Sequence, residues 1–62
     1  MNFTNAYAMN AKEYTDTLTR LNNRLINHEI DMERYLRFME LAKDRERLKN
    51  EEIMRQERRF MR

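Results

Sequence analysis

The sequence contains no glycine, no proline and no cysteine. Without glycine and proline, the chain lacks the residues that usually make tight turns and phosphate-binding loops, which excludes P-loops and dinucleotide-binding fingerprints. Without cysteine, it can form neither disulfides nor cysteine-ligated zinc or iron–sulfur sites. Long apolar runs are missing as well, because no window approaches the ~18 consecutive apolar residues of a membrane-spanning helix. No cation precedes Lys12, so we also expect no secretory signal and a cytoplasmic location.

The composition is that of one small helical domain. The 62 residues are 40% hydrophobic and 39% charged, which leaves little material for a deep core. Leucine, methionine, alanine, glutamate, lysine and arginine are abundant, and all of them favour helices. The formal net charge of +2 is too small by itself to indicate a nucleic-acid-binding protein. The sequence therefore predicts an all-α fold.

A heptad pattern of mostly apolar residues runs along the first two thirds of the chain. Alternate spacings of three and four predict a coiled-coil-like seam. The next two positions of the pattern are Glu46 and Lys49, so residues 43–62 form a different, charged segment. The seam consists of Tyr7, Ala11, Tyr14, Leu18, Leu21, Leu25, His28, Met32, Tyr35, Met39 and Ala42.

The seam predicts an antiparallel hairpin, because a reversal between Leu25 and His28 places large residues opposite large ones. The expected layers are Leu21 with Met32, Leu18 with Tyr35, Tyr14 with Met39, Ala11 with Ala42 and Tyr7 near Glu46.

We predict a single domain over residues 1–62, with a helix over about 4–25, a turn over about 26–28 and a longer helix over about 29–60. In the turn, Asn27 either caps the second helix or adopts the left-handed conformation in place of the missing glycine. The alternative is one long continuous helix in an antiparallel coiled-coil dimer, which makes the same layers. Sequence alone leaves both open.

A second apolar stripe predicts burial against another chain. It comprises Ile26, Ile30, Leu41 and Leu48 and is interleaved with Arg34 and Arg37, while a small single-seam core rarely supplies more than ~3–5 kcal/mol. The stripe indicates self-association, most simply as a homodimer, or a docking face for a different protein.

The inventory of reactive side chains argues against catalysis. His28 is the only histidine, and the chain has neither cysteine nor serine, so a zinc site or a nucleophilic triad lacks its residues. Carboxylates lie among arginines and lysines at helix-neighbour spacing, which is typical of solvated ion pairs. We therefore expect no enzyme activity, no metal and no cofactor.

The C-terminal segment, residues 43–62, is basic. Eight cations and five anions give it a net charge of +3, against −1 for residues 1–42. On a helix, Arg55, Arg58, Arg59 and Arg62 share one face, and Ile53, Met54, Phe60 and Met61 gather towards the other. Such a helix is consistent with a solvated tail, with a helix that docks on an acidic protein rim, or with phosphate contacts. Its acidic residues disfavour a membrane surface.

The leading hypothesis is a small non-enzymatic interaction or regulatory protein that binds another protein through its second helix and basic C-terminal helix. The composition is also typical of accessory proteins of phages and other mobile elements. The alternative is a small nucleic-acid-binding regulator that places its C-terminal arginines on phosphates. The residues predicted to contact a partner are Ile30, Arg34, Arg37, Leu41, Arg55, Arg58, Arg59 and Phe60.

Overall fold

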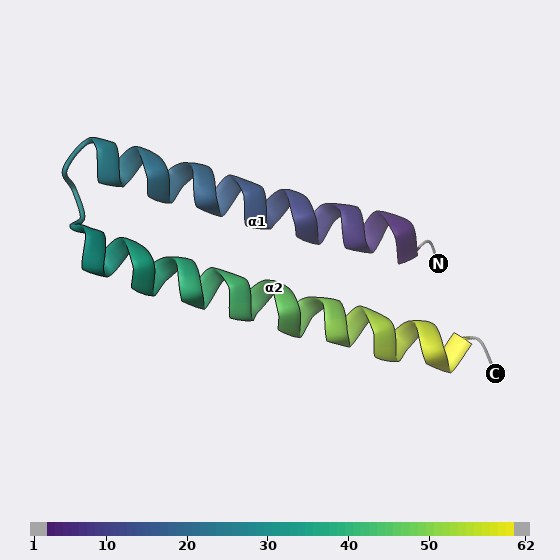
Figure 1. Ribbon diagram of the computed structural model, residues 1–62. Helices are drawn as coiled ribbons and strands as arrows, with labels where there is room; N and C mark the ends of the chain where they lie inside the picture. The colour runs from purple at the N-terminus through teal and green to yellow at the C-terminus, as the bar shows by residue number, and fades with distance from the viewer. Residues whose placement is uncertain (1–2, 61–62) are drawn as a thin grey trace.

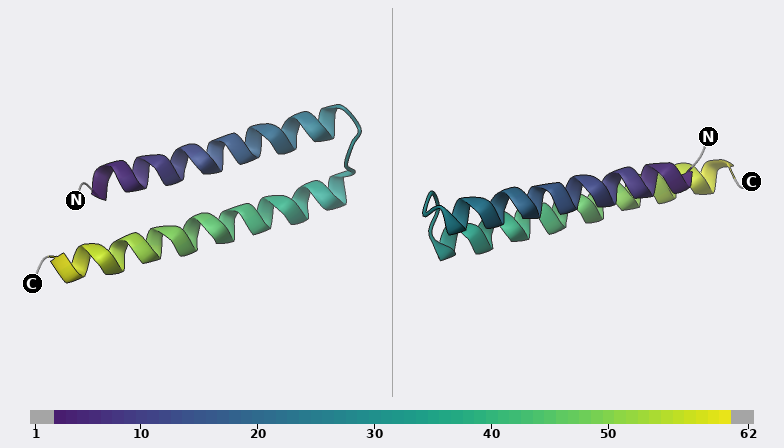
Figure 2. Two further views of the ribbon diagram at one scale, coloured as in Figure 1. Left: turned by 180° about the vertical axis from the view of Figure 1, so that it is seen from behind. Right: turned by 90° about the horizontal axis from the view of Figure 1, so that it is seen from above.

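A computed structural model of the chain describes residues 3–60 and shows an antiparallel helical hairpin (Figure 1). Helix α1 (Phe3–Ile26) and the longer helix α2 (Met32–Phe60) are joined by residues 27–31. The helices lie side by side from the turn to the open end, where both termini are found (Figure 2), and the Cα atoms span 50 × 17 × 8 Å. This confirms the predicted all-α hairpin over the continuous helix. No helix within the described range is long and apolar enough to cross a bilayer.

Helix α1 ends in a Schellman motif built around His28. His28 has a φ of 59°, the left-handed conformation that glycine usually supplies. The His28 N–H donates to the Leu25 carbonyl at 3.1 Å, and the Glu29 N–H donates to the Arg24 carbonyl at 2.9 Å. An Arg24–Glu29 ion pair of 3.5 Å bridges the two positions that an apolar contact normally joins. Both predicted alternatives for Asn27 are wrong, because His28 is the residue with positive φ among those described and Asp31 supplies the cap of α2; the Asn27 N–H still makes a helical bond to Asn23.

Helix α2 begins at an aspartate cap. The Asp31 carboxylate accepts the backbone N–H of Arg34 at 2.8 Å, the standard bond from an N-cap to the third helical residue. Glu33 adds a negative charge to the first turn, where the helix dipole favours it. The end of α1 around His28 and the cap at Asp31 together extend the connection over residues 27–31, which is longer than the predicted turn of 26–28. Helix α2 therefore starts at Met32 rather than near residue 29.

The apolar core lies in the half of the hairpin nearest the turn. Leu21 of α1 and Ile30 of the loop are the buried apolar side chains of the described chain, at 6% and 7% exposed. Half-buried residues from both helices surround this region: Leu18, Leu25, Tyr35 and Met39. The predicted placement of Leu18, Leu21 and Leu25 on the side of α1 that faces α2 agrees with their burial.

The predicted layers, however, are in the wrong register. Tyr7 contacts Glu57 rather than Glu46, and the side chains of Ala11 and Met32 are exposed. Asn10 takes the buried position expected for Ala11. A heptad pattern repeats every seven residues, so a longer turn can move the pairing along α2 while apolar residues still face each other. In addition, the side chains of a straight helix rotate by ~20° per heptad relative to an ideal heptad pattern.

Candidate interaction surfaces

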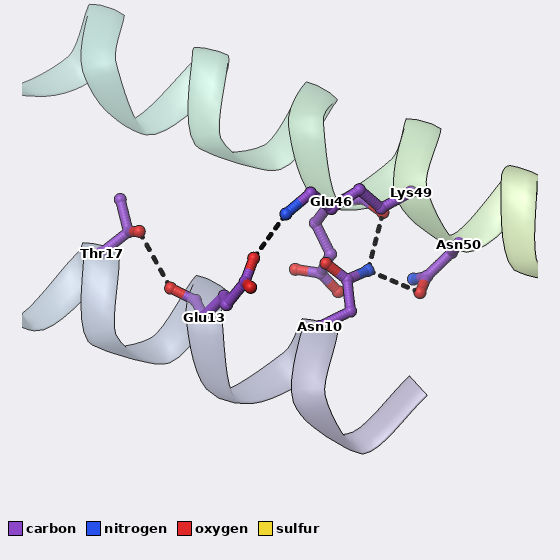
Figure 3. Close-up of polar contacts among 6 residues, drawn as sticks. All are labelled: Asn10, Glu13, Thr17, Glu46, Lys49 and Asn50. Carbon is purple, nitrogen blue, oxygen red and sulfur yellow. Dashed lines mark hydrogen bonds and ion pairs between the residues drawn. The ribbon is translucent and has the colours of Figure 1, made fainter. Parts of the chain in front are cut away.

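A polar cluster joins the helices towards the open end, and Asn10 is its centre (Figure 3). The Asn10 side chain is 6% exposed, and its Nδ2 donates to Asn50 Oδ1 at 2.8 Å and to the Glu46 backbone carbonyl at 3.2 Å. A buried amide without partners would cost about 1–3 kcal/mol. Because Asn10 finds both acceptors at this level of α2, the cluster favours this register of the hairpin.

Charged and aromatic contacts also join the two helices on either side of Asn10. Lys49 Nζ forms a hydrogen-bonded ion pair with Glu13 (Figure 3). The hydrogen bond and the charge of Lys49 lower the pKa of the Glu13 carboxyl. Nearer the termini, the Phe3 and Phe60 rings meet edge to face with centroids 5.7 Å apart. These contacts hold the helices together where apolar seam residues are scarce.

Tyr7 also joins the two helices near the open end. Its hydroxyl donates to Glu57 Oε1 at 3.4 Å. Burial, followed by the charge of Glu57 and this hydrogen bond, raises the pKa of the Tyr7 hydroxyl. The phenol is therefore protonated at neutral pH and acts as the donor in this contact. Among residues 3–60, no three His, Asp or Glu side chains are grouped to hold a metal ion.

A shallow groove of about 340 Å³ runs between the helices on one side of the hairpin. Its apolar lining comes from Leu21 of α1 and from Phe38, Leu41 and Ala42 of α2. Polar residues and charged residues of both signs line the rest: Asn10, Glu13, Tyr14, Thr17, Arg24, Arg45, Glu46 and Lys49.

The α2 side of the groove continues into an exposed apolar surface. Leu41 and Leu48 lie seven residues apart and therefore on one side of α2, and each is 58% exposed. Phe38 lies one turn before Leu41 and is partly exposed. We call Phe38, Leu41 and Leu48 the leucine flank. Arg34 and Arg37 precede it along α2, and Glu52 and Arg55 follow it.

Most of the predicted contact residues are on the surface of α2. Arg34, Arg37, Leu41, Arg55, Arg58, Arg59 and Phe60 are all exposed. Arg37 pairs with Glu33 at 3.4 Å and Arg55 with Glu52 at 3.8 Å, but such exposed pairs are weak and can exchange partners. Met61 and Arg62 of the predicted tail lie outside the described residues.

Ile30 is the exception, and its prediction as an accessible contact is wrong. It is buried in the loop, directly before the Asp31 cap. Ile26 is exposed but ends α1 rather than belonging to α2. The predicted stripe from Ile26 to Leu48 is therefore broken at the turn, because α2 starts later than expected, and only Leu41 and Leu48 form a surface.

Sequence reasoning missed the polar cluster. Asn10 precedes Tyr14 by four residues and Leu21 by eleven, so helical spacing alone puts it on the buried face. Asparagine is polar, so a pattern of mainly apolar residues does not include it. Comparisons with protein-family models, with curated proteins and with solved structures find no match for this chain.

Proposed function

We propose that the protein is a non-enzymatic interaction module of the cytoplasm that binds another protein through α2. The observation that carries this proposal is the exposed surface of α2, which combines two leucines that are more than half exposed with an exposed basic end, on a helix whose other side packs on α1. Apolar residues exposed in this way, beside charged ones, are typical of docking surfaces.

The basic end of α2 supports a partner with an acidic rim. Arg58 and Arg59 are exposed and form no ion pair with another described residue, and Arg55 has only its weak pair with Glu52. Phe60 is 69% exposed even though one edge of its ring meets Phe3. An apolar anchor beside free guanidinium groups suits a protein surface with an apolar pocket and carboxylates at its edge.

The experiment compares affinity capture from cells of the source organism by three forms of the chain. The intact protein and a control, Lys12→Gln with Lys43→Gln, should retain the same bound protein. The variant Arg55→Gln, Arg58→Gln and Arg59→Gln should lose it. The captured protein is then purified, and its direct affinity for all three forms is measured by calorimetry. Equal binding by all forms would contradict the role of the basic end.

Phosphate contact is the competing outcome for the same arginines. Anisotropy titrations with duplex DNA and with RNA at two salt concentrations distinguish it, because phosphate binding weakens steeply with salt. Glu51 and Glu52 precede the arginines and repel a phosphate backbone. We therefore expect no binding at moderate salt. Tight, salt-sensitive binding lost in the arginine variant would replace the proposed function with nucleic-acid binding.

A further inference from the structure

We propose that the leucine flank binds a second copy of this chain, with the two α2 helices antiparallel, so that two hairpins form a four-helix bundle. This inference rests on the proposed role of α2 as the interaction helix and gives its central part a specific occupant. Arg58 and Arg59, at the basic end of α2, lie beyond the start of the second copy's α2 and remain available to a different protein.

The exposed area of the hairpin matches the needs of a dimer. The chain exposes 5410 Å², whereas a compact monomer of its mass exposes about 4,400 Å². The excess is close to the ~800 Å² that each partner buries in a standard interface. An extended shape only 8 Å thick in its Cα atoms leaves both sides of each helix open. One further layer of helices would cover this excess.

The charges along α2 identify the second copy and its direction. Arg37 lies four residues before Leu41 and Arg34 seven before it, so one end of the flank carries two cations. Glu52 lies four residues after Leu48 and Arg55 seven after it, so the other end carries an anion and a cation. About a two-fold axis between Asp44 and Arg45, Leu41 faces Leu48 of the second copy, and Arg37 faces Glu52. A parallel copy would place Arg37 against Arg37. The antiparallel arrangement also sets Arg34 against Arg55, but it makes one attractive contact at each end of the flank, whereas a parallel copy makes only like-charge contacts there.

The proposed contact cannot form within one chain. Arg37 and Glu52 are fifteen residues apart on α2, or roughly 22 Å at the rise of an α-helix. It cannot form in a domain-swapped dimer of continuous helices either, because there the α2 segment of one chain pairs with the α1 segment of the other. Each single swap also breaks an ion pair within α2, Arg37 with Glu33 or Glu52 with Arg55, so it is the recovery of the dimer in the double variant that reports on this interface.

The test measures the dimer dissociation constant by sedimentation equilibrium for Arg37→Glu, for Glu52→Arg and for the double variant. The two-fold axis places each contact in the interface twice. Each single variant should weaken the dimer roughly tenfold, and the double variant should return close to wild type. Lys12→Glu, which makes the same charge change on α1, should leave the constant unchanged. Circular dichroism checks that every variant keeps its helix content.

A second variant probes the apolar part of the interface. Leu41→Lys replaces an exposed leucine, so the hairpin should fold while the dimer is lost. A wild-type chain that stays monomeric up to about 1 mM, a dimer unaffected by Leu41→Lys, or single variants that the double does not rescue would each overturn the second copy.

The two proposals can fail separately. A monomeric chain that still binds a different protein through Arg55, Arg58 and Arg59 overturns only the second copy. A dimer rescued by the charge swap, with no arginine-dependent binding of any other protein, overturns only the proposed function.

Discussion

The two halves of the hairpin are held together by different chemistry. Near the turn, Leu21 and Ile30 are buried, and both helix ends are capped. Towards the open end, the helices meet through Asn10, the Glu13–Lys49 pair and the Tyr7–Glu57 bond. Apolar burial stabilises without direction, whereas a hydrogen bond requires a particular partner. The turn half therefore supplies most of the stability, and the open half supplies the register.

The largest effect should come from the turn half. Leu21→Ala removes the most buried apolar side chain and should cost about 2–5 kcal/mol, enough to unfold most of a chain this small. Leu36→Ala is the matched control, because Leu36 is half exposed. Thermal melts followed by circular dichroism measure both. If the two variants melt alike, the core does not lie where the hairpin places it.

The open half should respond more weakly and in a different way. Asn10→Ala should cost about 1–2 kcal/mol, because the variant loses two hydrogen bonds but leaves Asn50 partly exposed to water. In a double-mutant cycle with Asn50→Ala, the two changes should be coupled by about 1 kcal/mol. Additive costs from urea titrations would show that the amides do not bond. A spin-label distance between the helices reports whether the register shifts.

This contrast explains how much could be read from the sequence. The hairpin, its longer second helix and the seam at Leu18, Leu21 and Leu25 follow from apolar periodicity, which is a strong signal. The register does not, because a heptad repeats after seven residues and the bonds of Asn10 are visible only in three dimensions. The exposure of the predicted contact residues on α2 followed from spacing, but the burial of Ile30 did not, because it depends on where the Asp31 cap starts the helix.

The turn itself offers a smaller, stabilising change. His28 has a φ of 59°, a conformation that costs a non-glycine residue roughly 1–2 kcal/mol. Glycine avoids this cost but loses about 0.5–1 kcal/mol more conformational entropy when the chain folds. His28→Gly should therefore raise the stability by up to about 1 kcal/mol, seen as a higher midpoint in urea. Asn27→Gly is the control and should destabilise, because Asn27 still forms a helical bond. The opposite order would place the left-handed residue at Asn27.

The smallest effect should be a pH dependence located in the open half. The Glu13 carboxyl has a pKa below its ordinary value of 4.5, first because Lys49 hydrogen-bonds to it and then because of the Lys49 charge. An acid with a lowered pKa in the folded state stabilises fully above its unfolded pKa, and this contribution is lost as the pH falls through the folded pKa. The melting temperature should therefore decrease as the pH is lowered below 4.5. This decrease should be smaller in Glu13→Gln, which lacks the titrating carboxyl. Because the Lys49 and Glu13 side chains are 43% and 61% exposed, added salt should weaken the effect. If the melting temperature falls equally with pH in wild type and Glu13→Gln, the Glu13–Lys49 pair does not stabilise the open end. Asn10 would then be the main polar contact between the helices there.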